Sequence, residues 1–222
     1  IKRVTEWFNQ QVPPDNPLGP EEAEKMLRIA AGQGKPGTKT GSELARPGDA
    51  KEGYMAEGSI APDGRHVLFT FRDPASGEAD LWVFDVRPTA VPRFTKVVSA
   101  PGYDGGGFFS PDGKRLCYRS DRQGNSELQI FVADLTFDAA DPAKITGSTN
   151  ERQLTSDAGS VNWAPYWSRD GQYLVYASSV QGHQNYELYA LKVSDPSVRA
   201  RVTTAPGFDG LPAFSDDGAL LM

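Results

Sequence analysis

A five-residue phrase that ends in Asp-Gly occurs four times in this chain, and it constrains the fold more strongly than any other feature of the sequence. In chain order the copies are residues 60–64 (Ile-Ala-Pro-Asp-Gly), 109–113 (Phe-Ser-Pro-Asp-Gly), 167–171 (Trp-Ser-Arg-Asp-Gly) and 214–218 (Phe-Ser-Asp-Asp-Gly). Their glycines stand at positions 64, 113, 171 and 218, so the successive steps are 49, 58 and 47 residues. A period near 50 residues is typical of solenoids, propellers and other repeat arrays. The repeated unit is therefore the feature that the fold must explain.

Each Asp-Gly pair predicts a tight turn between two antiparallel strands. Glycine adopts the positive φ that such turns require, and short apolar runs flank the pair on both sides. Because these runs are nearly continuous, we expect strands whose two faces are both covered by neighbouring sheets. The aspartate and the glycine are therefore interpreted as turn-forming rather than catalytic residues in all four copies: Asp63 and Gly64, Asp112 and Gly113, Asp170 and Gly171, Asp217 and Gly218.

Two more strands are predicted to follow the turn in each unit. The first of them is expected at residues 80–86, 127–132 and 187–193, and the second at 96–99, 152–155 and 201–204. Four antiparallel strands per unit predict the blades of an all-β propeller. A β-sandwich with accidental internal similarity is the alternative, and the matching strand positions of all units disfavour it. The middle unit carries about ten extra residues within positions 136–150, which predict a surface insertion suited to contact a partner.

The repeat resembles that of the TolB-like, or WD40-like, β-propellers. The resemblance rests above all on residues 109–114 (Phe-Ser-Pro-Asp-Gly-Lys) and 119–122 (Arg-Ser-Asp-Arg), and it covers roughly residues 54–222. A ring of this type has about six blades of about 47 residues each. Three full blades and part of a fourth therefore imply that the chain is a piece of a longer propeller. The resemblance also implies a bacterial protein of the periplasm or another extracytoplasmic compartment.

Residues 1–40 lack the repeat and are expected to form a helical extension and a linker, so that the propeller would occupy residues 41–222. A helix is predicted here because apolar residues follow Pro20 with helical spacing: Ala23, Met26, Leu27 and Ala30. Gly32 follows the last of these positions as a stop signal. We interpret this part as an arm that accompanies the propeller rather than as a separate functional domain.

Charge, hydropathy and cysteine content exclude several classes of function. No apolar run approaches the roughly 18 residues that a membrane-spanning helix needs. With 23 basic against 29 acidic residues, the net charge of -6 offers no basic surface for nucleic acid. The single cysteine, Cys117, cannot form an internal disulfide, and its position between Leu116 and Tyr118 predicts a small core residue.

The sequence contains none of the common catalytic motifs. There is no Gly-x-Ser-x-Gly nucleophile elbow, no Walker loop, no Rossmann glycine pattern and no His-Glu-x-x-His. The two histidines, His66 and His183, belong to different units and form neither a zinc site nor a catalytic triad. We therefore expect no catalysis by this chain, so that any catalytic domain would lie outside it.

One polar pattern stands out as a candidate site. Residues 101–105 (Pro-Gly-Tyr-Asp-Gly) and 206–210 (Pro-Gly-Phe-Asp-Gly) repeat the same phrase, and the unit between them has Asn162 at the matching place. Because the innermost strand of a blade begins at the channel mouth, we expect Asp104, Asn162 and Asp209 around one entrance. They either cap turns through backbone amides or bind a cation or a basic peptide segment. In the second case Asp104 and Asp209 would suit Ca²⁺ better than zinc, and no other cofactor is expected.

The resemblance implies a non-catalytic, exported scaffold that binds other envelope proteins or peptides. Two alternatives stay open from the sequence. In the first alternative, the chain is the gating or substrate-selecting propeller of a larger exported hydrolase similar to prolyl oligopeptidase. In the second alternative, it is a subunit of a larger envelope or redox complex. Propeller repeats occur in all three contexts, so the fold does not choose between them.

Overall fold

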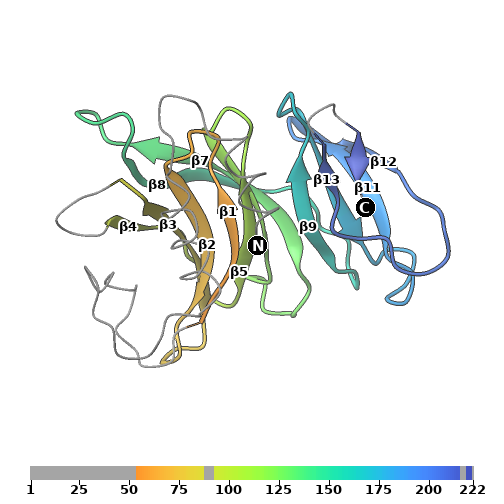
Figure 1. Ribbon diagram of the computed structural model, residues 1–222. Coiled ribbons are helices and arrows are strands. Elements are labelled where there is room, and N and C mark those ends of the chain that lie inside the picture. The colour runs from red at the N-terminus through yellow and green to blue at the C-terminus, as the bar shows by residue number, and fades with distance from the viewer. Residues whose placement is uncertain (1–53, 88–92, 216–218, 222) are drawn as a thin grey trace, which may run out of the picture. The chain divides into compact units, whose positions relative to one another are not determined.

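The computed structural model describes residues 54–87, 93–215 and 219–221, and within these ranges the secondary structure consists of strands and turns (Figure 1). The expected helix, the expected boundary at residue 41, and the turn residues Asp217 and Gly218 lie outside the described residues. The all-β class predicted from the repeat is confirmed. Its strands form successive antiparallel sheets rather than the two packed sheets of a sandwich.

Three four-stranded antiparallel sheets follow one another along the chain, and each is one blade. Blade I contains β1 (Tyr54–Ile60), β2 (His66–Arg72), β3 (Ala79–Asp85) and β4 (Arg93–Val98). Blade II contains β5 (Asp104–Phe109), β6 (Arg115–Ser120), β7 (Gln129–Phe137) and β8 (Ile145–Gln153). Blade III contains β9 (Asn162–Trp167), β10 (Tyr173–Ser178), β11 (Glu187–Lys192) and β12 (Asp195–Arg201). A hairpin of β13 (Ala213–Phe214) and β14 (Leu220–Leu221) begins a fourth unit.

The hydrophobic core lies between neighbouring blades, as the nearly continuous apolar runs predict. Successive residues of a strand point to opposite faces of its sheet, so each blade can pack on both sides. On β6, Leu116 and Tyr118 join a core with Leu68 and Leu81 of blade I. The residue between them, Cys117, belongs to a second core that blade II shares with blade III. Burial raises the pKa of the Cys117 thiol, which is the behaviour of a packed core residue.

The Asp-Gly turns lie next to one another at one end of the blades. In blade II the carboxylate of Asp112 accepts hydrogen bonds from the Ser110 hydroxyl at 2.6 Å and from the Lys114 amide at 3.1 Å. Gly113 has a φ of 68°, in the left-handed region that favours glycine. A Cβ placed on Gly113 would stand 4.0 Å from Pro62, the proline of the preceding turn. The turns of successive blades therefore share one edge of the array.

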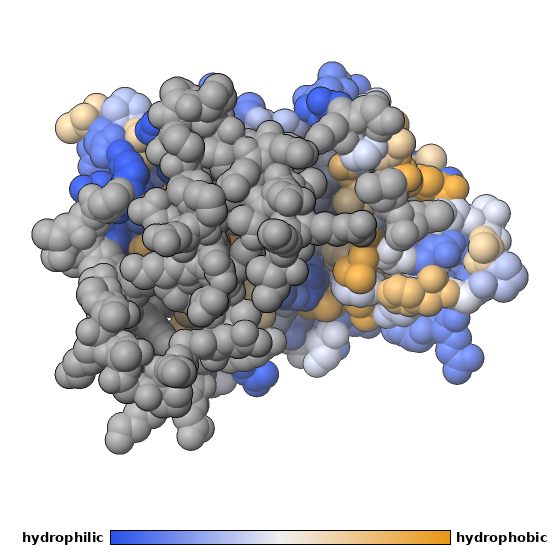
Figure 2. All heavy atoms as spheres, in the orientation of Figure 1, coloured by the Kyte–Doolittle hydropathy of each residue, from blue (hydrophilic) through white to orange (hydrophobic). Residues whose placement is uncertain are grey.

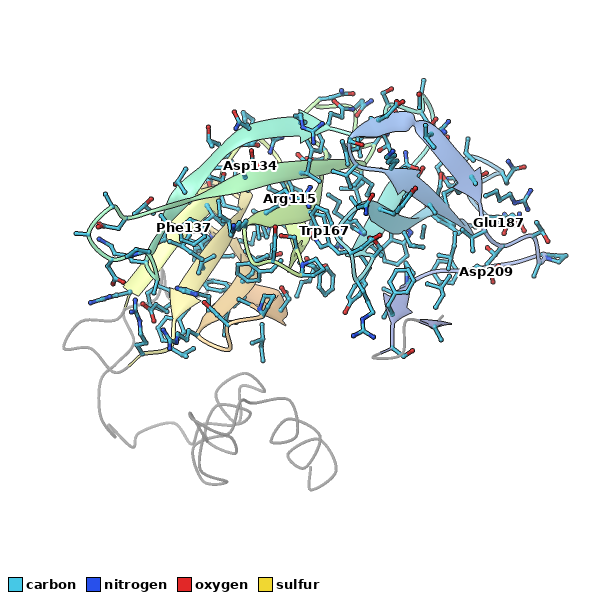
Figure 3. The ribbon with its side chains drawn as sticks, turned by 90° about the horizontal axis from the view of Figure 1, so that it is seen from above. Arg115, Asp134, Phe137, Trp167, Glu187 and Asp209 are labelled. Carbon is cyan, nitrogen blue, oxygen red and sulfur yellow. The ribbon has the colours of Figure 1, made fainter. Side chains whose placement is uncertain are left out.

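Side chains from one turn also reach the next blade. Arg115, two residues after the turn glycine of blade II, donates a hydrogen bond to the carbonyl of Gly171 at 2.8 Å. The same guanidinium lies over the ring of Trp167 at 4.7 Å, and Figure 3 shows the two residues together between the blades. Trp167 is buried in the core of blades II and III, where its large ring fills space between the two sheets.

The extra residues of the middle unit lengthen β7 and β8 to nine residues each. The hairpin extends along β7 past Asp134 and Phe137 (Figure 3), and it packs against β4 of blade I. Ile145 is only 4% exposed and belongs to the core between blades I and II. The Thr95 hydroxyl donates to the Ile145 carbonyl at 3.2 Å, so the hairpin fastens two blades together. The insertion lies at the surface along most of β8, and Ile145 anchors it in the core between blades I and II.

Each outermost strand begins at an earlier residue than the sequence predicts. β12 ends at Arg201, where we expected a strand at 201–204 to begin, and it pairs with β11 through Tyr189 opposite Arg201. Thr203 follows β12 and uses its hydroxyl to accept a hydrogen bond from the Leu188 amide at 2.9 Å. Because an outer strand is exposed on its edge and its face, it needs no apolar pattern, and sequence periodicity cannot find its ends.

Candidate functional site

The end of the blades opposite the Asp-Gly turns carries the candidate site. In each blade, the first and third strands begin at this end, and the second strand ends there. We call it the loop face and define it by its connectors: residues 73–78, 99–103, 121–128, 154–161, 179–186 and 202–212. Parallel bridges between Ala79 and Tyr103 and between Tyr186 and Phe208 join connectors of neighbouring units. The three residues predicted for the channel mouth all lie at this end.

Asp104 lies at the start of β5 and is fully buried. Its carboxylate accepts hydrogen bonds from the Ala100 amide at 2.8 Å and from the Arg122 guanidinium at 2.9 Å. Burial raises the pKa of Asp104, and the hydrogen bonds from Ser120 and Arg122 oppose that rise. Arg122 also binds Glu151 at 2.6 Å, so it links the connector to the outer strand of blade II. The bond to Ala100 is the turn-capping geometry that we gave as one of the two interpretations of Asp104.

Asn162 and Asp209 occupy the matching places of the next two units, in different surroundings. Asn162 is fully buried at the start of β9, and its amide group donates to Gln129 at 2.8 Å. Asp209 is partly exposed in the connector before β13, where Figure 3 labels it beyond Glu187 of β11. Its backbone amide donates to Tyr186 at 2.9 Å, and its carboxylate makes no hydrogen bond to another described residue. Of the two aspartates, only Asp209 thus has a carboxylate open to a ligand, because both carboxylate oxygens of Asp104 accept hydrogen bonds.

A buried polar residue stands at the first or second position of the third strand in blades I, II and III, and sequence reasoning missed this position. Asp80, Gln129 and Glu187 occupy it, with exposed fractions of 6%, 2% and 0%. Asp80 binds Lys96 at 2.6 Å, and Glu187 accepts hydrogen bonds from Thr203 at 2.7 Å and from Arg201. The sequence does not reveal the partners of these polar residues, such as Lys96 on β4 and Arg201 on β12.

Glu57, Tyr103 and Arg119 form a polar cluster between blades I and II. The Tyr103 hydroxyl donates to Glu57 at 2.6 Å, the Thr70 hydroxyl donates to the same carboxylate at 3.0 Å, and Arg119 forms an ion pair with it. The Arg119 guanidinium also lies 5.4 Å from the centre of the Tyr103 ring and 5.9 Å from that of Trp163. These contacts lower the pKa of Glu57 against the opposing effect of burial.

A left-handed backbone residue recurs at the same place in each unit, on the innermost strand of blades I to III and just before β13 in the fourth unit. Glu57, Gly106, Ala164 and Leu211 have φ values of 56°, 59°, 50° and 55°. Their steps are 49, 58 and 47 residues, the same as those of the turn glycines. In β1, β5 and β9 the ladder with the second strand shifts register at this point, so the residue marks a β-bulge. No residue type is shared by the four positions, and the sequence therefore gives no signal for them.

The repeated phrase of residues 101–105 and 206–210 places an aromatic ring over a glycine. A Cβ on Gly105 would stand 2.3 Å from the Tyr103 hydroxyl oxygen, and one on Gly210 would stand 2.5 Å from the Phe208 ring. Phe208 is 59% exposed and lies 5.9 Å from Trp163 between ring centres. Tyr103, Arg119, Trp163 and Phe208 thus follow one another in contact, and we call them the aromatic–arginine strip. The sequence pattern drew attention to the aspartates, whereas the structure exposes Phe208, one of the two aromatic residues beside them.

A groove of about 650 Å³ opens on the loop face between blades I and II. We call it the interblade groove. Its lining includes Arg72, Glu78, Tyr103, Arg119, Asp121 and Ser126. The lining carries charges of both signs.

Among residues 54–87, 93–215 and 219–221, no three His, Cys, Asp or Glu side chains come together as a set of metal ligands. The described part of the chain likewise contains no helix long and apolar enough to cross a membrane.

The blades, their repeated turns and the loop face define a β-propeller. No family model matches the chain. The Tol-Pal system protein TolB of Wolinella succinogenes is 28% identical over 175 residues, which are 77% of this chain and 36% of the relative. TolB of Helicobacter hepaticus is 24% identical over 171 residues. The chain thus spans little more than a third of the length of these relatives.

Solved structures agree with this assignment of the fold. TolB from Acinetobacter baumannii matches with a TM-score of 0.53 and 22% identity over 73% of this chain and 35% of its own. A puromycin-hydrolysing peptidase of Mycobacterium tuberculosis matches with a TM-score of 0.56 and 14% identity, over 75% of this chain and 27% of its own. The chain is thus similar in sequence to TolB proteins and shares the β-propeller fold of these solved structures.

Proposed function

We propose that the chain acts without catalysis, as part of an exported, periplasmic platform that binds envelope proteins or their peptide segments on its loop face. The observation that carries the proposal is the aromatic–arginine strip, which crosses from blade II to the fourth unit. Tyr, Trp and Arg are the residues that most often dominate the binding energy of protein interfaces. The names of the TolB relatives, which belong to a Tol-Pal system, support a partner in the cell envelope.

The exposed apolar surface supports the same part of the molecule as the binding region. Apolar residues gather on the portion that carries β9 and β11 to β13 (Figure 2). Phe208 and Leu211 are 59% and 66% exposed, and both stand in the connector that leads to β13. A contiguous exposed apolar patch that is rimmed by polar groups is typical of an interaction site.

The proposal is tested by capture of envelope proteins from the source bacterium on immobilised wild-type chain, with identification of the partner by mass spectrometry. Phe208→Ser is expected to reduce recovery of that partner at least about tenfold, since a central interface aromatic contributes about 2 kcal/mol or more. Val198→Ser is the matched control, because Val198 is 51% exposed on the outer strand β12. Equal recovery by the Phe208 and Val198 variants would contradict the proposal.

The earlier hypothesis of a ligand at Asp104, Asn162 and Asp209 is tested in the same assay. Asp209→Ala removes the partly exposed carboxylate, whereas Asp104→Ala removes a buried one that binds Arg122 and Ala100. If this ring binds a cation or a basic segment, Asp209→Ala lowers affinity for Ca²⁺ or for the captured partner without changing the folding of the chain. Unchanged affinity for both would remove Asp209 from the site.

A further inference from the structure

The interblade groove offers negative charge that is not matched by its own lining. Four charged side chains line it: Arg72, Glu78, Arg119 and Asp121. The charge of Arg119 is already compensated by its ion pair with Glu57. Arg72 then stands against two carboxylates, Glu78 and Asp121, which leaves a net charge of one negative unit in the groove. Complementarity therefore favours a cationic occupant.

The two carboxylates keep acceptor capacity that the fold does not use. One oxygen of Asp121 accepts a hydrogen bond from the Tyr103 amide at 2.7 Å, and the other makes none with a described residue. The Glu78 carboxylate makes no hydrogen bond or ion pair with any residue that the structure describes, although the backbone carbonyl of Glu78 accepts from Asp73 at 2.9 Å. A carboxylate has about four acceptor positions, so both side chains can receive further donors.

The equivalent position between blades II and III shows that the fold does not require unpaired carboxylates at this place. Glu127 follows Glu78 by 49 residues, the same step that separates the turn glycines Gly64 and Gly113. Both oxygens of Glu127 are occupied, by the Asn125 side chain at 2.9 Å and by the Gly159 amide at 3.0 Å. The position that matches Asp121 in blade III is Ser179. The open carboxylate pair is thus particular to the groove between blades I and II.

We propose that the interblade groove binds the lysine or arginine side chain of a peptide segment, with Glu78 and Asp121 as its anionic partners. The proposal rests on the proposed function, because it names the chemistry by which the loop face selects a partner. The partner's cationic head lies between the two carboxylates, and the stem of its side chain runs along the groove beside Tyr103. Arg72 repels this positive charge and thereby weakens binding.

The experiment uses three pentapeptides with blocked ends, Ala-Ala-Lys-Ala-Ala and its glutamine and glutamate counterparts, titrated into ¹⁵N-labelled protein. The lysine peptide is expected to bind in the millimolar range and to shift the amide resonances of Gly77, Gly102 and Ser126, which line the groove. Glu78→Gln and Asp121→Asn should each weaken it by up to about fivefold, the range of exposed ion pairs. Asp121→Asn keeps an oxygen for the Tyr103 amide. Arg72→Gln should strengthen binding by a similar factor.

The matched control is Glu127→Gln, which removes the same charge one blade further along and should leave the affinity unchanged. Equal shifts with the glutamine peptide, tighter binding of the glutamate peptide, or weaker binding after Arg72→Gln would each overturn the proposal. The outcome is separable from that of the proposed function. Loss of partner capture in Phe208→Ser with no lysine-dependent shifts would retain the platform and remove the groove from it.

Discussion

The left-handed residues of the inner strands make one prediction that depends closely on the tertiary structure. Gly106 has a φ of 59°, and a Cβ at this position would stand 2.0 Å from a guanidinium nitrogen of Arg119. In Gly106→Ala the methyl group must displace Arg119, which breaks the ion pair with Glu57. Ala164 occupies the equivalent position of blade III with a φ of 50°, so Ala164→Gly tests the same backbone geometry in the opposite direction.

The expected magnitude follows from three effects. A left-handed conformation costs an alanine about 1–2 kcal/mol relative to glycine. Loss of the partly exposed pair of Arg119 and Glu57 costs up to about 1 kcal/mol. A smaller gain, about 0.4–1 kcal/mol, comes from the stiffer unfolded chain of the alanine variant. Gly106→Ala should therefore lower the free energy of unfolding by about 2 kcal/mol. In Ala164→Gly the relief of strain is offset by unfolded-state entropy and by a lost buried methyl group of about 0.8 kcal/mol, so little change is expected.

Urea denaturation followed by tryptophan fluorescence measures both free energies. A second comparison isolates the contact with Arg119, because in the Arg119→Ala background the added methyl group meets no guanidinium. There the cost of Gly106→Ala should fall to about 1 kcal/mol, the backbone part alone. The reasoning is refuted if Gly106→Ala destabilises the protein no more than Ala164→Gly does, or if its cost is the same in both backgrounds.

Two further predictions concern the blade contacts. Ile145→Ala should lower the free energy of unfolding by about 2–4 kcal/mol in thermal or urea denaturation, because the β7–β8 hairpin is part of the core, whereas Thr146→Ala on its exposed side should change it by less than about 0.5 kcal/mol. Similar small effects of both would mean that the hairpin is not packed on blade I. Two hydrogen bonds from Arg199, at 2.7 and 2.8 Å, lower the pKa of Asp157. The resulting stability is present above the ordinary pKa of an aspartate and is lost as the pH falls through the lowered value. Arg199→Gln should therefore cost up to about 1 kcal/mol at pH 7 and much less near pH 3, and a constant difference across this range would contradict the assignment.

The repeat, the blade architecture and the first three strands of each blade could be predicted from the sequence. Asp-Gly turns and alternating apolar residues act over a few neighbouring residues, so they can be recognised locally. The third strand at Glu187–Lys192 lies within one residue of its prediction for this reason. The predicted positions of the outer strands were wrong by several residues, because an exposed edge strand carries no such pattern.

The candidate site, too, could be predicted only in part from the sequence. The sequence by itself determined that an aromatic residue and an aspartate recur where the inner strands begin, because that phrase is repeated in the chain. Only the tertiary structure decided that Asp104 is buried against Arg122, that Phe208 is exposed, and that Glu57 meets Arg119 from 62 residues away. The physical reason is that local preferences fix turns and strands, whereas the partner of a polar side chain is fixed by how one blade docks on the next.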